Sequence, residues 1–157
     1  NYDSMQRSYI GKIYPAFEVT TLDGRKITQD SLIGKVTWLN FWFEDCPGCR
    51  NEFDKLNKLY DSLKNNPDFR FVAITYDRKE TLPAFIKQFN LNFPIATVTS
   101  EAIAQTMNYG NGFPTNMIID KHGKVALVRW WLTERPAKYG ILMDDAYKMI
   151  TELSEQP

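Results

Sequence analysis

A chain of 157 residues, 43% of them hydrophobic, is about the length of one domain and is long enough to bury a substantial core. Nineteen Lys and Arg residues balance nineteen Asp and Glu residues, which argues against nucleic acid or a membrane surface as a partner. The longest strongly apolar stretch, 36–43, is far shorter than the roughly 18 residues of a membrane helix. We therefore expect a soluble protein with a single domain over residues 1–157.

The order of the expected elements follows from hydrophobic periodicity and turn signals. An Asp23-Gly24 dipeptide between two short extended runs is a strong hairpin signal. The run before the cysteines is β-branched and aromatic throughout, which is typical of a central strand covered on both faces. In chain order we expect a flexible N-terminal segment at 1–10, strands at 16–20, 26–28 and 35–43, a helix at 47–65, a strand at 69–75, a helix at 82–89, a strand at 93–97, a helix at 100–107, strands at 116–120 and 124–131, and a helix at 141–153.

This order of elements predicts the fold class. Strands that alternate with helices and end in an antiparallel hairpin indicate an α/β protein with a mixed central sheet. Helices on both faces would make it a three-layer α/β/α sandwich, extended by the N-terminal β-hairpin. Near the end of the last strand, Trp130 and Trp131 must point to opposite faces, and core packing is expected for both.

Cys46 and Cys49 are the only cysteines of the chain, and they stand where the central strand gives way to a helix. So short a loop does little to stabilise a fold, which favours a chemical use of the pair. Unpaired N–H groups and the dipole at a helix start favour a thiolate, so Cys46 is the predicted nucleophile. Cys49, one turn further along the same helix face, would resolve a mixed disulfide formed at Cys46.

Metal binding is the first alternative for a Cys-x-x-Cys pair. Zinc would need two further ligands, yet the chain has no third cysteine and a single histidine, His122, in an expected hairpin turn. We therefore expect no metal and no cofactor apart from the Cys46-Cys49 dithiol itself. An inert pair or a purely structural disulfide is the other alternative.

Several motifs around the cysteines occur together in one known group of proteins. They are Gly34-Lys35-Val36, Leu39-Asn40-Phe41-Trp42 and Cys46-Pro47-Gly48-Cys49-Arg50-Asn51-Glu52-Phe53, supported by the segment 11–17, the Asp23-Gly24 turn, Phe113-Pro114-Thr115 and the segment 119–125. With them the chain resembles the TlpA/ResA-like thiol-disulfide oxidoreductases, a branch of the thioredoxin-like proteins related to the redoxin and AhpC/TSA group. The resemblance covers about residues 11–153.

This resemblance implies further site residues. Pro114 would be cis and lie beside the dithiol, and the backbone before it would pair with a peptide substrate, so Phe113 and Pro114 are the expected substrate-binding residues. The resemblance also implies a functional glutamate at Glu52, which could take the proton of Cys49 as its sulfur attacks. The alternative for Glu52 is a solvated acid near a helix start. Structural residues expected beside the pair are Pro47 and Trp42.

The chain departs from related proteins at two places. Asn40 stands where many thioredoxins carry a buried aspartate, and an amide cannot accept the proton. Glu44 and Asp45 precede Cys46, where an aromatic residue is usual in the resembled family. Two carboxylates there would oppose thiolate formation and favour basic substrate surfaces.

The expected function is thiol-disulfide exchange, with reduction of disulfides in extracytoplasmic partner proteins as the leading form. The partners would be a disulfide-containing protein and an upstream membrane or soluble thiol reductant. The resemblance implies a periplasmic or otherwise extracytoplasmic location, with tethering through a segment outside this chain as one option, although residues 1–11 show no signal peptide. The alternatives are a thiol peroxidase of the peroxiredoxin type and a non-catalytic or metal-binding interaction module.

Overall fold

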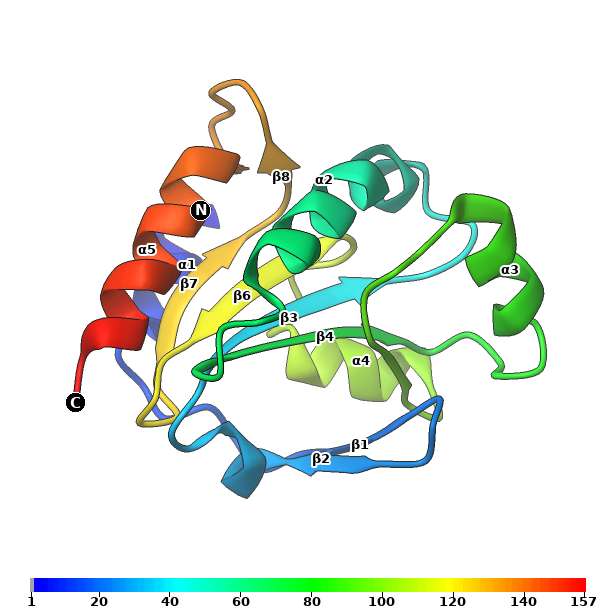
Figure 1. The fold of residues 1–157 in the computed structure, drawn as a ribbon, viewed down its shortest axis with the longest axis horizontal. Helices are drawn as coiled ribbons and strands as arrows, with labels where there is room; N and C mark the ends of the chain where they lie inside the picture. Colours follow the sequence, from blue (N-terminus) through cyan, green and yellow to red (C-terminus); the bar gives the residue numbers. More distant parts are fainter. Residues whose placement is uncertain (1) are drawn as a thin grey trace.

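The computed structural model describes residues 2–157, with side chains from residue 6 onward. Its middle layer is a sheet of seven strands, which are β1 (Glu18–Thr21), β2 (Lys26–Thr28), β3 (Val36–Trp42), β4 (Phe69–Thr75), β5 (Ile95–Thr97), β6 (Thr115–Ile119) and β7 (Val125–Arg129). They lie in the order β2-β1-β5-β4-β3-β6-β7 (Figure 1). Strands β3, β4 and β5 are parallel, whereas β6 and β7 run antiparallel to their neighbours. The predicted mixed sheet with an N-terminal hairpin, formed by β1 and β2, is confirmed.

Helices cover both faces of this sheet (Figure 1). They are α1 (Tyr2–Tyr9), the 3₁₀ helix η1 (Gln29–Leu32), α2 (Pro47–Leu63), α3 (Leu82–Phe89), α4 (Glu101–Met107) and α5 (Met143–Glu155). Apolar residues of α2, α3 and α5 share one core with Trp38 and Trp42 of β3. On the other face, Met107 of α4 packs in a second core with Phe41 of β3. The protein is therefore the expected three-layer α/β/α sandwich.

Strand β3 is buried along its whole length because helices lie on both of its faces. Alternate side chains of a strand point to opposite faces, so Trp38, Asn40 and Trp42 all face the side of α2. In β6, Asn116 is the register partner of Asn40 and points to the same side. Two amides thus lie next to each other under α2, at positions where apolar side chains are the rule.

The N-terminal segment is helical in the structure. Residues 2–9 form α1, and buried Gln6 accepts a hydrogen bond from the Arg129 guanidinium at the end of β7. The ring of Tyr9 stacks on that of Tyr109, with 3.8 Å between the ring centroids. The flexibility expected for residues 1–10, like the single-domain assignment, stays a prediction.

The chain after β7 differs from the expected long strand. A small parallel pair of strands, β8 (Leu132–Thr133) and β9 (Ile141–Leu142), precedes α5. Trp131 lies between β7 and β8 and is 36% exposed, so the expected core packing is wrong for this residue. Its carbonyl oxygen accepts a hydrogen bond from Ile141 N at 2.7 Å, which turns the chain away from the sheet and presents the indole ring at the surface.

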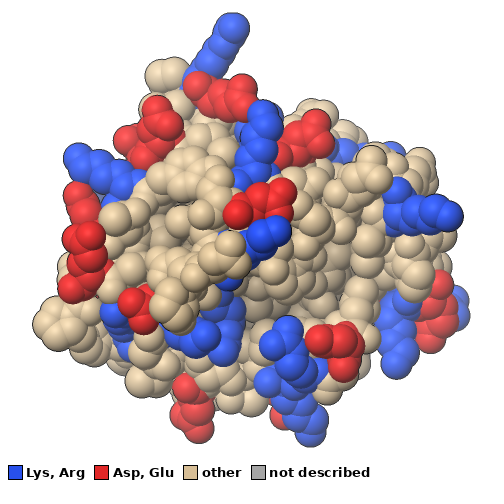
Figure 2. All heavy atoms as spheres, viewed as in Figure 1, with Lys and Arg blue, Asp and Glu red and all other residues tan. Residues whose placement is uncertain are grey.

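The charges of the chain are mixed over its surface. Figure 2 shows Lys and Arg interspersed with Asp and Glu over the viewed face, consistent with the balanced composition. No helix within residues 2–157 is long and apolar enough to cross a membrane.

Candidate active site

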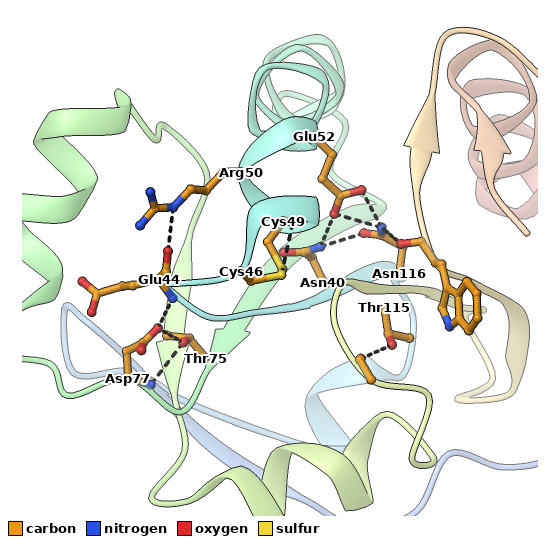
Figure 3. Close-up of a disulfide and its surroundings, with 12 residues drawn as sticks. Asn40, Glu44, Cys46, Cys49, Arg50, Glu52, Thr75, Asp77, Thr115 and Asn116 are labelled. Carbon is orange, nitrogen blue, oxygen red and sulfur yellow. Dashed lines mark hydrogen bonds between the residues drawn. A yellow bond between two sulfur atoms is a disulfide. The ribbon is translucent and has the colours of Figure 1, made fainter. Parts of the chain in front are cut away.

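Cys46 and Cys49 form a disulfide at the first turn of α2, directly after β3 (Figure 3). Cys46 is the N-cap residue of α2, and its Sγ accepts a hydrogen bond from Cys49 N at 3.2 Å. Pro47 begins the helix, where its missing N–H costs no hydrogen bond. A sulfur in this position lies at the positive end of the helix dipole, which stabilises a thiolate once the disulfide is opened.

The loop before β6 closes over the start of α2. The Phe113-Pro114 peptide bond is cis, as the resemblance implies. A Cβ at Gly48 would lie 3.3 Å from Pro114 Cδ and 3.4 Å from Trp131 Nε1. The absence of a side chain at Gly48 therefore lets both rings lie close to the backbone between the two cysteines. Trp131 is a neighbour of the dithiol that the sequence reasoning missed, because it expected this residue in the core.

Trp42 holds the end of β3 against the helices. It is fully buried, with its ring edge-on to Phe53 at 5.6 Å and stacked on Phe85 at 5.5 Å between centroids. The guanidinium of Arg50 covers the outer side of this cluster, 5.5 Å from the Phe85 centroid. This packing is consistent with the structural role predicted for Trp42. It fixes the end of β3, which precedes the loop that leads to Cys46.

Glu52 is buried one turn after Cys49, with only 2% of its surface exposed. The alternative of a solvated acid is therefore wrong. Its carboxylate accepts hydrogen bonds from Asn40 Nδ2 at 3.0 Å, from Asn116 Nδ2 at 3.1 and 3.2 Å, and from Leu132 N at 2.9 Å. Burial raises the pKa of Glu52 to about 7, because desolvation of the charged form outweighs these donors. A carboxyl group with this pKa can exchange a proton near neutral pH.

Asn116 connects the carboxylate to the sheet. Its Oδ1 accepts hydrogen bonds from Trp38 Nε1 at 3.0 Å and from Asn40 Nδ2 at 2.9 Å, and its Nδ2 also donates to Trp130 O at 3.0 Å. The sequence reasoning did not single out Asn116. A polar residue at an inward position of a core strand, two residues before Ile118, was the available signal.

The two carboxylates that precede Cys46 lie at the surface. The Glu44 carboxylate accepts a hydrogen bond from Thr81 Oγ1 at 3.0 Å, and Figure 3 shows it directed away from the disulfide. The Asp45 side chain is 96% exposed, with 3.8 Å between its Oδ1 and Arg50 Nη2. Asp77 Oδ2 accepts a hydrogen bond from Glu44 N at 2.8 Å, which fixes the backbone before Cys46. The Asp45 charge is therefore solvated, and Glu44 is half-buried with its carboxylate held by Thr81.

A cleft of about 480 Å³ lies beside α2 and is lined in part by Gly48, Glu52, Lys55 and Trp131. Glu52, which is 2% exposed, is thus among the residues that line this cleft.

His122 lies in the exposed turn between β6 and β7, as expected. Within the described residues there is no group of three or more His, Cys, Asp or Glu side chains that could hold a metal ion. The redox-active candidate in this part of the chain is the Cys46-Cys49 pair.

Comparison with known proteins identifies the family. The model of the AhpC/TSA family matches residues 10–128. The thiol-disulfide oxidoreductase ResA of Bacillus cereus is 38% identical over 121 residues, which cover 76% of this chain and 69% of that protein. The chain belongs to the ResA-like thiol-disulfide oxidoreductases of the AhpC/TSA family.

Solved structures agree with the ResA-like assignment. A candidate protein disulfide isomerase from Bacteroides thetaiotaomicron superposes with a TM-score of 0.76 at 27% identity, covering 94% of this chain and 91% of that one. A candidate thiol:disulfide interchange protein DsbE from Chlorobium tepidum gives 0.72 at 25% identity, covering 92% and 96%. The thioredoxin-like fold and the thiol-disulfide oxidoreductase activity expected from the sequence are thereby confirmed.

In this ResA-like oxidoreductase the fold brings the sequence-predicted site residues together. Cys46, Cys49 and Glu52 lie at the N-cap and in the first two turns of α2, and Pro114 packs beside Gly48. The structure adds Asn116 and Trp131, which come from later parts of the chain. The individual roles of these residues are proposals.

Proposed function

We propose that this oxidoreductase reduces disulfides of extracytoplasmic partner proteins through the Cys46-Cys49 dithiol, with Glu52 as the proton acceptor of the resolving step. The observation that carries the proposal is the buried Glu52 carboxyl group, whose pKa of about 7 suits proton transfer and which lies one turn after Cys49. An inert or purely structural disulfide would have no use for a buried acid beside it.

The reaction begins at Cys46. In the reduced protein its thiolate, stabilised by the start of α2, attacks one sulfur of the substrate disulfide. A new sulfur-sulfur bond forms between Cys46 and the substrate, and the other substrate sulfur leaves as a thiolate. One end of the substrate is then held as a mixed disulfide.

Cys49 completes the transfer. Its thiol loses a proton to the Glu52 carboxylate, and its sulfur attacks Cys46 Sγ. The Cys46-Cys49 bond forms, the bond to the substrate breaks, and the second substrate sulfur leaves as a thiolate. Two electrons have then passed from the dithiol to the substrate, and the cleft beside Glu52 returns the proton to solvent.

Substrate binding is assigned to the loop that ends at Pro114. Phe113 is half-buried and packs edge-to-face on Phe43 at 5.4 Å, with Tyr76 at 5.7 Å between centroids. These rings form an apolar surface next to Cys46 against which side chains of a substrate segment would pack. The backbone before Pro114 would align that segment, as the family resemblance implies.

The rest of the redox system is proposed from the same resemblance. The dithiol needs no cofactor of its own, and an upstream membrane or soluble thiol reductant would return Cys46 and Cys49 to the reduced state. The location would be periplasmic or otherwise extracytoplasmic, with a tether outside this chain as one arrangement.

Trapping the intermediate tests the order of attack. A Cys49→Ser variant should accumulate a covalent complex with a disulfide-containing protein through Cys46, because no second sulfur can release it. The complex is detected by mass spectrometry and should disappear on treatment with dithiothreitol. The Cys46→Ser variant is the control and should trap nothing. Equal trapping by both variants would contradict the assignment of Cys46 as the nucleophile.

A further inference from the structure

The orientation of two buried amides follows from Trp38. Its indole N–H can only donate, and it lies 3.0 Å from Asn116 Oδ1. Asn116 Nδ2 therefore faces the Glu52 carboxylate, at 3.1 and 3.2 Å from its two oxygens. Asn40 Nδ2 donates hydrogen bonds to Asn116 Oδ1 at 2.9 Å and to Glu52 Oε1 at 3.0 Å. Both of these oxygens are acceptors. The neighbours thus fix which end of each amide carries the nitrogen.

This arrangement leaves the oxygen of Asn40 unpaired. Asn40 is fully buried, and its Oδ1 has no hydrogen-bond partner in the described part of the chain. In the view of Figure 3, Asn40 is drawn between Glu52 and the disulfide, and its Nδ2 bonds to Glu52, which lies one turn after Cys49 on α2. A buried acceptor without a donor is unfavourable. The disulfide has no hydrogen to donate, whereas the thiol of reduced Cys49 has one.

We propose that Asn40 and Asn116 are positioning residues for the resolving step: Asn116 holds the Glu52 carboxylate, and Asn40 joins that carboxylate to Cys49. In the reduced protein the Cys49 thiol donates its hydrogen to Asn40 Oδ1, while Asn40 Nδ2 stays bonded to Glu52 Oε1. This inference rests on the proposed function, because it assigns the support of the proton acceptor named there.

The pairing has a defined consequence for the chemistry. A hydrogen bond from the Cys49 thiol to Asn40 favours the protonated form of Cys49 while Cys46 is the thiolate, so the first attack comes from Cys46. After the mixed disulfide forms, the proton of Cys49 moves to Glu52 as the Cys46-Cys49 bond replaces the bond to the substrate. No proton passes through the Asn40 amide. The amide only aligns the Cys49 thiol, which gives up the proton, with the Glu52 carboxylate, which accepts it.

Stopped-flow reaction of the reduced protein with dithiobis(nitrobenzoate) separates the two steps. The first coloured thiolate is released when Cys46 attacks the reagent, and the second when Cys49 resolves the mixed disulfide. Asn40→Leu should slow the second phase about tenfold, which is part of the rate enhancement that general base catalysis contributes. It should change the first phase by less than about twofold. The matched control is Thr37→Val, because Thr37 is also a buried residue of β3 with an unpaired side-chain oxygen but is outside the Glu52 network.

Asn116 is tested through the pH profile of the second phase. Asn116→Leu removes donors that lower the pKa of Glu52, so the pH midpoint of the second phase should move upward. In a Glu52→Gln background the same substitution should change the second phase no further. An equal effect in both backgrounds would show that Asn116 does not act through Glu52 and would overturn its assignment.

The outcomes separate the two levels of the account. A second phase that Glu52→Gln leaves unchanged contradicts the proposed function itself. A second phase slowed by Glu52→Gln but not by Asn40→Leu contradicts this inference alone. If Asn40→Leu does not fold, the inference is tested by the infrared S–H stretching band of the reduced wild-type protein. A hydrogen-bonded Cys49 thiol supports the inference, and a free thiol overturns it.

Discussion

Glu52 lies one turn after Cys49 on α2, whereas Glu44 and Asp45 lie in the loop before Cys46, and Figure 3 shows Glu44 and Glu52 on different sides of the disulfide. Glu52 is 2% exposed and bonded to two amides and a backbone N–H, whereas the Asp45 side chain is 96% exposed beside Arg50. The same chemical group therefore experiences two different dielectric environments within eight residues of sequence. Burial raises the pKa of the Glu52 carboxyl group to about 7.

This difference shows how the protein can keep acidic residues next to a thiolate. Water and counterions screen charges at the surface, so Glu44 and Asp45 oppose the Cys46 thiolate only weakly. A carboxylate in the core is not screened, and burial stabilises its neutral form. Glu52 can consequently accept a proton when Cys49 loses one, and it should dominate the pH behaviour of the site.

The largest expected effect comes from removing the buried acid. Glu52→Gln keeps the shape of the side chain but cannot accept a proton, so release of the mixed disulfide by Cys49 should slow by about a hundredfold at neutral pH. The dependence of that step on pH near 7 should also disappear. Single-turnover kinetics between pH 5 and 9 would measure both changes, and an unchanged profile would assign the proton acceptor elsewhere.

The stability of the oxidised protein should depend on pH in the direction opposite to that of most carboxylates. The pKa of Glu52 is about 7 in the folded state against 4.5 for an unperturbed group, so between these values the folded state binds more protons than the unfolded state. The free energy of unfolding should therefore fall by roughly 3 kcal/mol as pH rises through this window. Denaturant unfolding of the wild-type protein and of Glu52→Gln isolates this contribution. If Glu52 has an ordinary pKa, the free energies of unfolding of the two proteins should change with pH in the same way between pH 4.5 and 7.

The smallest effect is expected at the surface pair. Removing both charges with Glu44→Gln and Asp45→Asn should increase the rate of Cys46 alkylation by iodoacetamide by less than about twofold at physiological ionic strength. The increase should be larger at low salt. A tenfold increase that salt does not reduce would mean that these carboxylates act directly on the sulfur.

Much of the fold could be predicted because periodicity and turn chemistry are local. The run before the cysteines became β3, and the limits of β4 and α3 agree with the expected ranges. Ser100 caps α4 by accepting a hydrogen bond from Ile103 N at 3.2 Å. The position of the dithiol at a strand-to-helix junction was also visible in the sequence, since Pro47 is a strong marker of a first helical turn.

The buried network could not be predicted in the same way. Asn116 lies 64 residues after Glu52 in sequence, and their contact depends on the register of β6 against β3. Trp131 reaches Gly48 only because the chain turns between β7 and β8, which no periodic pattern marks. The sequence indicated that Asn40 replaces an acid but did not indicate that it bonds to Glu52.

The reduction potential of the Cys46-Cys49 couple tests the central claim most directly. The protein would be equilibrated in thiol-disulfide buffers of known potential, and its free thiols would be counted by alkylation and mass spectrometry. A potential of about −250 mV or lower is expected for a reductase of protein disulfides. A value near about −120 mV would contradict the account, because the protein would then act as an oxidant of its partners.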